Sequence, residues 1–290
     1  DLNITDSNFS GNKDSEGAND ITLANGADVS FTVNEGVNSS LSGGLKTNGT
    51  GADGELSTFT KDGSGKLTIG GKNAGFTGNV DIKAGDVVFN AGTGDSFFGR
   101  SENSKITIAD GTSLYINASK VDLEGGHFAG QGGLTIDTTG QNFNLYGNNA
   151  GYTGNAVLNN TIVNYIAENN DDTIFGGTVQ LLNGASLSTR TEDSLAYKGG
   201  NFSSHDNATF NKNDSGEFTL VGNNSGFQGT ANLYAGTTNF VKNDNTSFFG
   251  GNVVIDSVLN YTANADETLN GAISGSGTIN KDGAQTLTLN

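Results

Sequence analysis

The sequence predicts an all-β fold wound as a β-solenoid, that is, a parallel β-helix of about 12 coils. Three observations lead to this prediction. Short stretches of alternating apolar residues are separated by Gly- and Asn-rich turns, a pattern recurs along the chain, and the 290 residues include 45 Gly but no Pro. Only 33% of the residues are hydrophobic, which suits a narrow core.

The strand signal is an alternation of apolar and polar residues, as at 80–82, 106–108 and 134–136. No stretch repeats apolar residues at helical spacing over three turns, so we expect essentially no helix. Disorder is disfavoured because 17 Phe and 7 Tyr accompany many Val, Ile and Thr residues, which favour strands.

Internal markers define a repeat of about 75 residues. The pattern Gly-(Phe/Tyr)-x-Gly ends segments 67–78, 143–154 and 218–229. Two further markers recur in the same order, the first at 97–99, 174–177 and 248–251, the second at 41–45, 123–128, 197–202 and 269–273. We therefore expect a single β-solenoid over 1–290, a fragment of a longer protein, with repeats at 1–66 (partial), 67–142, 143–217 and 218–290.

A solenoid fits this repeat better than a β-propeller, whose blades take roughly 40 to 50 residues each. A repeat of about 75 residues divides into three coils of about 25. Proline would delete a donor from the ladders between coils, which explains its absence. Glycine supplies positive φ angles at corners, and Asn-Gly at 25–26, 48–49, 183–184 and 270–271 fits that use.

Charge and composition exclude several classes of function. The net charge of −17 and the presence of only two arginines, Arg100 and Arg190, argue against nucleic acid as a partner. The absence of Cys excludes disulfides, thiolate chemistry and iron–sulfur clusters, and His127 and His205 are the only histidines. No apolar run could cross a bilayer, and the first residues do not form a signal peptide. Because the chain lacks even an initiator Met, we expect it to be a processed product or an excised fragment.

Two kinds of catalytic site can be tested against the sequence. A serine protease would need a Gly-Asp-Ser-Gly type of phrase; 213–216 with His205 is the nearest match and 94–97 a weaker one, but chance accounts for both in a chain this rich in Asp, Ser and Gly. A glycan-cleaving enzyme would need clustered carboxylates, for which Asp171-Asp172 with Glu168, and Glu192-Asp193 near Arg190, are candidates. Solvated corners are the simpler explanation, and we assign no catalytic residue.

Cofactor and metal sites are not predicted either. The calcium-binding β-roll nonapeptide is absent, since 130–135 lacks its Asp. Calcium is a candidate only at the acidic turns 170–172 and 243–245, where an Asx turn is the simpler explanation. The recurring aromatic residues are expected to pack in the core or at corners rather than to form a ligand strip: Phe76, Tyr152, Phe227, Phe98, Phe175 and Phe249.

The phrase Gly-x-Asn-(Ala/Ser)-Gly-(Phe/Tyr)-(Thr/Gln)-Gly after Leu-Thr-Leu or Leu-Thr-Ile resembles the passenger-associated repeats of bacterial autotransporters. The ending 273–289 and the earlier segment 59–69 resemble the Gly-Ser-Gly-Thr-Leu-x-Lys phrase of that family. The resemblance implies a right-handed parallel β-helix that serves as adhesin, autoaggregation factor, protease or toxin. It also implies a signal peptide and an outer-membrane barrel outside this segment, and the lack of Cys suits export of an unfolded chain.

We therefore expect a non-enzymatic surface protein, extracellular and either anchored to the outer membrane or secreted, that acts in adhesion or cell–cell aggregation. Its expected partners are a receptor, glycan or matrix on a host or neighbouring cell, or another copy of itself. Nucleic acid is not expected, and membrane contact is expected only through the barrel. A self-assembling extracellular fibre and a glycan-cleaving enzyme on the same scaffold are the alternatives.

Overall fold

The chain folds as a β-solenoid of about 12 turns, spaced by roughly 22 residues, in which the stacked strands are all parallel. The computed structural model describes residues 1–9, 20–24, 26–49, 54–99, 101, 103–119, 122–191, 194–205 and 207–290, and no α-helix occurs among them. The predicted fold class is confirmed. The turns form two compact units, Asp1–Phe143 and Asn144–Asn290.

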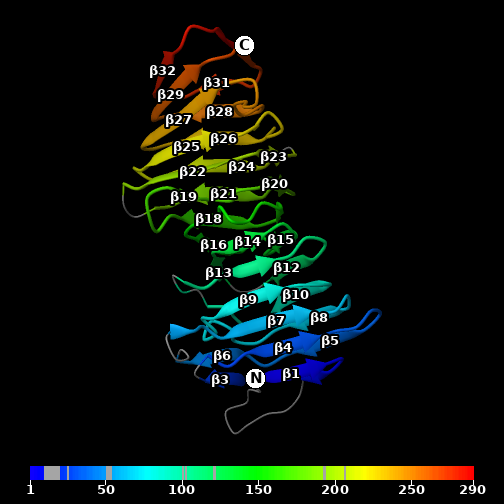
Figure 1. Ribbon diagram of the computed structural model, residues 1–290. Helices are drawn as coiled ribbons and strands as arrows, with labels where there is room; N and C mark the ends of the chain where they lie inside the picture. Colours follow the sequence, from blue (N-terminus) through cyan, green and yellow to red (C-terminus); the bar gives the residue numbers. More distant parts are fainter. Residues whose placement is uncertain are drawn as a thin grey trace. The chain divides into compact units, whose positions relative to one another are not determined.

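In the first unit, strands from successive turns stack into faces, coloured blue through cyan to green in Figure 1. One face contains β1 (Leu2–Thr5), β4 (Val29–Thr32), β7 (Thr58–Asp62), β9 (Asn79–Ile82), β11 (Ile106–Ile108) and β14 (Phe128–Gly130). The next contains β2 (Asn8–Phe9), β5 (Asn38–Leu41), β8 (Lys66–Ile69), β10 (Asp86–Ala91), β12 (Ser113–Ala118) and β15 (Gly133–Asp137). The remaining strands are β3 (Ile21–Ala24), which pairs with β6 (Leu45–Asn48), and β13 (Leu123–Gly126).

The second unit has the same construction, coloured green to red in Figure 1. Its first face contains β17 (Asn155–Asn159), β20 (Thr178–Leu182) and β23 (Phe202–Ser204). Its second contains β18 (Ile162–Ile166), β21 (Ser186–Thr189), β24 (Thr209–Lys212), β26 (Thr230–Leu233), β28 (Asn252–Ile255) and β31 (Ile273–Ser274). Its third contains β19 (Asp172–Thr173), β22 (Ala196–Gly200), β25 (Glu217–Val221), β27 (Thr237–Lys242), β29 (Val258–Ala263) and β32 (Thr278–Asp282).

Two further strands of the second unit, β30 (Glu267–Leu269) and β33 (Leu287–Leu289), pair with each other. β16 (Asn142–Tyr146) spans the boundary between the units and shares the face of β18.

The register between turns places like residues above one another. Along β8, β10, β12 and β15 the inward row is Leu67, Val87, Leu114 and Leu134, and each is at most 1% exposed. Parallel strands lie about 4.8 Å apart, so each of these side chains contacts its counterpart in the turn above and the turn below. Each strand contributes only two or three inward residues, so the core forms from few apolar residues.

The recurring aromatic residues belong to this core, as the sequence predicts. Phe76, Tyr152 and Phe227 are fully buried, and Phe98, Phe175 and Phe249 are at most 3% exposed. They take part in ring contacts inside each unit, such as Phe76–Phe98 with centroids 5.9 Å apart and Phe227–Phe249 at 5.3 Å. Edge-on and tilted ring pairs of this kind add to the stability gained by burial.

The turn spacing of about 22 residues, against 25 expected, makes the 75-residue repeat slightly longer than three turns. One copy of the repeated phrase begins in β16, which shares the face of β18, β21 and β24. The next copy begins in β25, which lies on the following face with β22 and β27. Successive copies therefore advance by three turns and one face, and equivalent residues of these copies do not line up along one edge.

Three of the four predicted Asn-Gly turns use glycine as expected. Gly26, Gly49 and Gly184 have positive φ angles of 75°, 87° and 75°, while Asn25 lies outside the described residues. Gly271 differs, because its φ is not in the left-handed region and its role is close approach. A Cβ built on Gly271 would lie 1.9 Å from the Gly251 carbonyl oxygen of the preceding turn.

The Asn that recurs in the repeated phrase is buried, and its side chain hydrogen-bonds the backbone of the corner. Asn224 is fully buried, and its Nδ2 donates to the carbonyl oxygens of Val221, Gly222 and Ser247 at 2.9, 3.3 and 3.1 Å. Its Oδ1 accepts from the Phe202 N–H at 2.9 Å. Asn73 makes the corresponding contacts in the first unit, with Gly70, Gly71 and Ser96 as acceptors and Leu45 as donor.

Asn224→Asp tests these side-chain hydrogen bonds, because the substitution keeps the shape of the side chain and removes the Nδ2 donors. Three part-buried carbonyl oxygens would then lose a donor and face a carboxyl group, although those of Gly222 and Ser247 still accept the N–H groups of Ser247 and Asn224. We therefore expect the free energy of unfolding to fall by about 2 kcal/mol. Urea denaturation followed by circular dichroism measures it. Asn243→Asp at an exposed turn is the control. Equal stability of the two variants would show that the Asn224 hydrogen bonds do not stabilise the corner.

Two glycines separate backbone strain from close packing between turns. Gly36 and Gly63 have φ angles of 74° and 73°, but a Cβ on Gly36 would meet nothing within 4 Å, whereas one on Gly63 would lie 2.3 Å from the Val33 carbonyl oxygen of the preceding turn. We expect Gly36→Ala to cost about 1 kcal/mol for the left-handed backbone. Gly63→Ala should cost about 3 kcal/mol, because the turns must also move apart. Equal urea midpoints for the two variants would show that stacking tolerates the methyl group.

Candidate functional site

A buried ion pair lies at one corner of the second unit. Lys212 ends β24, and Asp214 follows it in the corner that leads to β25. The Lys212 Nζ donates to Asp214 Oδ1 at 2.8 Å, and the side chains of the two residues are 0% and 1% exposed. The same Nζ donates to the carbonyl oxygens of Asp214 at 2.5 Å and Ala235 at 3.1 Å, so the ammonium also links two successive turns.

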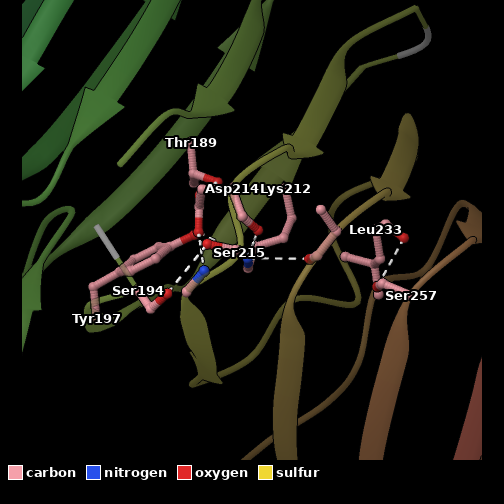
Figure 2. A network of polar contacts seen from close by, with 10 residues as sticks. Thr189, Ser194, Tyr197, Lys212, Asp214, Ser215, Leu233 and Ser257 are labelled. Atoms are coloured by element: carbon pink, nitrogen blue, oxygen red, sulfur yellow. Dashed lines mark hydrogen bonds and ion pairs between the residues drawn. The ribbon is translucent and has the colours of Figure 1, made fainter. Parts of the chain in front are cut away.

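The rest of the Asp214 carboxylate is also fully used (Figure 2). Its Oδ2 accepts hydrogen bonds from Thr189 Oγ1 at 2.5 Å and from Tyr197 Oη at 2.8 Å. Its Oδ1 accepts a further bond from the Gly216 N–H at 3.0 Å. A carboxylate with four donors, one of them the Lys212 ammonium, is stable in a dry environment, where an unpaired charge would be very costly.

These contacts shift the ionisation of every member. Burial raises the pKa of Asp214, but the hydrogen bonds from Lys212, Thr189 and Tyr197 and the charge of Lys212 outweigh burial, so the pKa lies below the ordinary 3.8. Burial lowers the pKa of Lys212, and Asp214 offsets this only in part. Burial and the nearby carboxylate raise the pKa of Tyr197. The Asp214 carboxyl is therefore ionised near neutral pH.

This corner contains the phrase that most resembled a protease nucleophile. Asp214 points inward to Lys212 and Tyr197, whereas Ser215 is exposed and its Oγ lies 3.3 Å from Ser194 Oγ (Figure 2). His205 is exposed. Among the described residues, no hydrogen bond joins Ser215 to His205 or Ser215 to Asp214 through side chains. The motif is a structural corner in this fold, and its Asp stabilises the turn.

The sequence analysis did not identify the lysines as corner residues. Lys61 is fully buried, and its Nζ donates to the carbonyl oxygens of Asp62, Gly63 and Ala84 at 3.0, 2.7 and 2.9 Å. Lys242 donates in the same way to Asn243 and Thr246. The available signal was Lys followed by Asp or Asn and then Gly or Asp at the end of a strand, which recurs at 61–63, 212–214, 242–244 and 281–283.

The acidic cluster at 168–172 also belongs to a corner. Asp172 is 3% exposed, and its Oδ2 accepts from the N–H groups of Glu168 and Asn169 at 2.8 and 2.9 Å. Asn170 Oδ1 accepts from the Ala196 N–H of the next turn at 2.9 Å, while Asp171 is exposed. The two neighbouring carboxylates therefore face different surroundings, and one of them is occupied by backbone donors.

The turn at 243–245 is an Asx turn, as the sequence predicts. Asn243 Oδ1 accepts from the Asn245 N–H at 2.9 Å. The Lys242 ammonium donates to the carbonyl oxygens of Asn243 and Thr246 at 2.9 and 2.5 Å. Within the described residues, no group of three or more His, Asp or Glu side chains could hold a metal ion.

The remaining candidates are dispersed. Arg190 is exposed, while Glu192, Asp193 and Arg100 lie outside the described residues. His127 has a φ of 54°, and its Nδ1 lies 3.1 Å from the carbonyl oxygen of Ser101, which makes it a corner residue too.

A surface hollow of about 310 Å³ lies in the first unit, at the ends of β5, β8 and β10. It is lined by Ser40, Leu41, Ser42, Thr68, Ile69, Gly70, Gly71, Asn90, Ala91, Gly92 and Asp95. Asp95 belongs to the second, weaker protease-like phrase. Ser96 of that phrase accepts a hydrogen bond from the Ala74 N–H at 2.9 Å, so its hydroxyl is tied to the backbone of the preceding turn.

The fold and its corners define a protein of the β-solenoid class, with parallel strands throughout the described turns. Comparisons of the chain with protein-family models, curated proteins and solved structures each found no match. Over the described residues, no helix is long and apolar enough to cross a membrane.

The Lys212–Asp214 pair makes stability depend on acid pH. Because the pKa of Asp214 is lower in the folded chain, its contribution is present above the ordinary 3.8 and is lost as the pH falls through the folded pKa. Asp214→Asn leaves Lys212 buried without a counter-charge, so the free energy of unfolding should fall by about 3 kcal/mol at neutral pH.

Urea denaturation at several pH values measures this difference between Asp214→Asn and the unmodified chain. We expect the difference to shrink as the pH falls below 3.8. Asp244→Asn, at an exposed position of another corner, is the control and should differ little from the unmodified chain at any pH. A penalty for Asp214→Asn that persists unchanged to about pH 2 would contradict the assignment.

Proposed function

We propose that this chain is the β-solenoid passenger of an autotransporter-like protein, a non-enzymatic extracellular surface protein that acts in adhesion or cell–cell aggregation. The observation that carries the proposal is the fixed geometry of the outer faces. Each face is a set of parallel strands whose corners are held by buried Asn and Lys side chains, such as Asn224 and Lys212. Surfaces fixed before binding lose little conformational entropy on contact with a partner.

Outward rows of polar side chains support this function. In the second unit, Asn280 Nδ2 donates to Asn260 Oδ1 at 3.0 Å, and Asn260 Nδ2 donates to Asn239 Oδ1 at 2.9 Å. Asn239 Nδ2 continues the row to Glu217. Such a ladder is wettable and ordered at once, a combination suited to polar partners on a cell surface.

The positions of the carboxylates favour adhesion over the glycan-cleaving alternative. Glycosidases need two carboxyl groups that face one substrate. Asp172, in one of the two carboxylate clusters considered for glycan cleavage, instead accepts hydrogen bonds from backbone N–H groups of its own corner. The other cluster, Glu192-Asp193, lies outside the described residues. The buried Asp172 carboxylate therefore stabilises its corner, and in the proposed function the partner contacts the outer faces.

Beads coated with the purified chain test the proposal. They should bind to cultured cells or aggregate with one another. The net charge of −17 opposes contact between coated surfaces, and salt shortens the Debye length from about 30 Å at 0.01 M to about 8 Å at physiological ionic strength, so aggregation should increase with salt.

Beads coated with bovine serum albumin control for acidic charge alone. Coated beads that neither bind cells nor aggregate at any ionic strength would overturn the proposal. Release of reducing ends from a polysaccharide by the purified chain would support the enzyme instead.

A further inference from the structure

The hollow in the first unit exists because glycines line it where strands end. Gly70 follows β8, and Gly92 follows β10. A Cβ added to Gly70 would meet only ordinary contacts, at 3.6 Å from Asp95 Oδ2 and 3.7 Å from the Asn90 carbonyl oxygen. The space above Gly70 is therefore open, and any larger side chain there would fill it.

The polar groups around this space are of the kind that bind hydroxyl groups. Asp95 is half-buried, and its Oδ2 accepts from the Gly92 N–H at 2.7 Å, which fixes the carboxylate beside Gly70. The Asn90 side chain is exposed and makes no hydrogen bond to another described residue. Hydroxyl groups of Ser40, Ser42 and Thr68 complete the polar lining.

A carboxylate and an amide can each bind two neighbouring hydroxyls, since the carboxylate accepts twice and the amide both donates and accepts. The hollow has the size of a small-molecule site, and most of its exposed lining is apolar, although the side chains of Leu41, Ile69 and Ala91 are buried in the core. Vicinal hydroxyls on a ring with apolar C–H faces are the chemistry of a pyranose sugar.

The charge of the lining narrows the ligand further. Asp95 is the one ionisable residue among those that line the hollow, and no Lys or Arg is among them. A carboxylated or sulfated sugar would bring a negative charge next to Asp95 inside a protein of net charge −17. The lining therefore favours a neutral sugar.

We propose that this hollow binds one neutral saccharide residue, with Asp95 and Asn90 as the hydroxyl-binding groups and Gly70 as the floor. The inference rests on the proposed adhesive function, because it names a ligand class for one outer face. In the sequence analysis Asp95 belonged to a protease-like phrase and Gly70 to a repeated segment, and the topology brings both next to Asn90.

Titration of the isotope-labelled 290-residue chain with methyl glycosides of glucose, galactose, mannose and N-acetylglucosamine tests the site by NMR. At least one should shift the amide signals of Gly70, Gly71 and Gly92, with an affinity in the millimolar range usual for so few contacts. Gly70→Val fills the hollow and should weaken binding at least tenfold. Asp95→Asn keeps the shape and should weaken it several-fold.

Gly133→Val is the matched control, because Gly133 lies on the same face outside the lining and an added Cβ would make only ordinary contacts, the nearest with Ser113 Oγ at 3.5 Å. Its affinity should equal that of the unmodified chain. No signal change with any neutral glycoside, or equal loss in Gly70→Val and Gly133→Val, would overturn the proposal. So would tighter binding of glucuronic acid methyl glycoside.

The outcome is separable from that of the adhesion test. Sugar binding without bead adhesion would refute the proposed function and leave this site standing. Adhesion that Gly70→Val leaves unchanged, together with no glycoside binding, would refute the site alone.

Discussion

Hydrogen bonding between the backbones of successive turns is the constraint on which the rest of this molecule depends. Each strand must find its partner about 22 residues away, in parallel and in register, throughout each unit. The constraint explains why a chain of 290 residues contains no Pro, because a proline in a paired strand lacks the N–H that the ladder between turns requires. It also explains how a hydrophobic content of 33% suffices for a core. The register stacks apolar residues such as Leu67 and Val87 on one another, so the interior is narrow and needs few of them.

Corners are where this constraint is hardest to meet, because backbone groups there turn away from the ladders while remaining buried. The chain satisfies them with its own polar side chains: Asn224 donates to three carbonyl oxygens, Lys61 donates to three others, and Asp172 accepts from two N–H groups. Such groups would draw attention as catalytic or metal-binding residues in another fold. Here their hydrogen bonds are committed to the corners of the fold.

The sequence predicted the fold class, the near absence of helix and the burial of the recurring aromatics such as Phe76 and Phe227. These follow from local alternation and from repetition, both of which are visible without knowing what pairs with what. The coil length was predicted less well, as 25 residues instead of about 22. A repeat of 75 residues divides evenly into three coils, and no local pattern shows that each repeat covers three turns and one more face. The Lys212–Asp214 pair was missed for a similar reason: Lys and Asp two residues apart resemble any polar loop until the corner is closed around them.

By itself, then, the sequence determined that this chain forms parallel coils with glycine-rich corners, because side-chain alternation and backbone freedom are properties of neighbouring residues. Only the tertiary structure decided which polar residues are buried and which remain open to solvent. Asp214 and Asp95 both occur in Asp-Ser phrases, yet Asp214 is enclosed by donors from three strands or corners, while Asp95 borders a hollow above Gly70. The difference depends on which turn lies above and below each residue, and that is set by the register between turns.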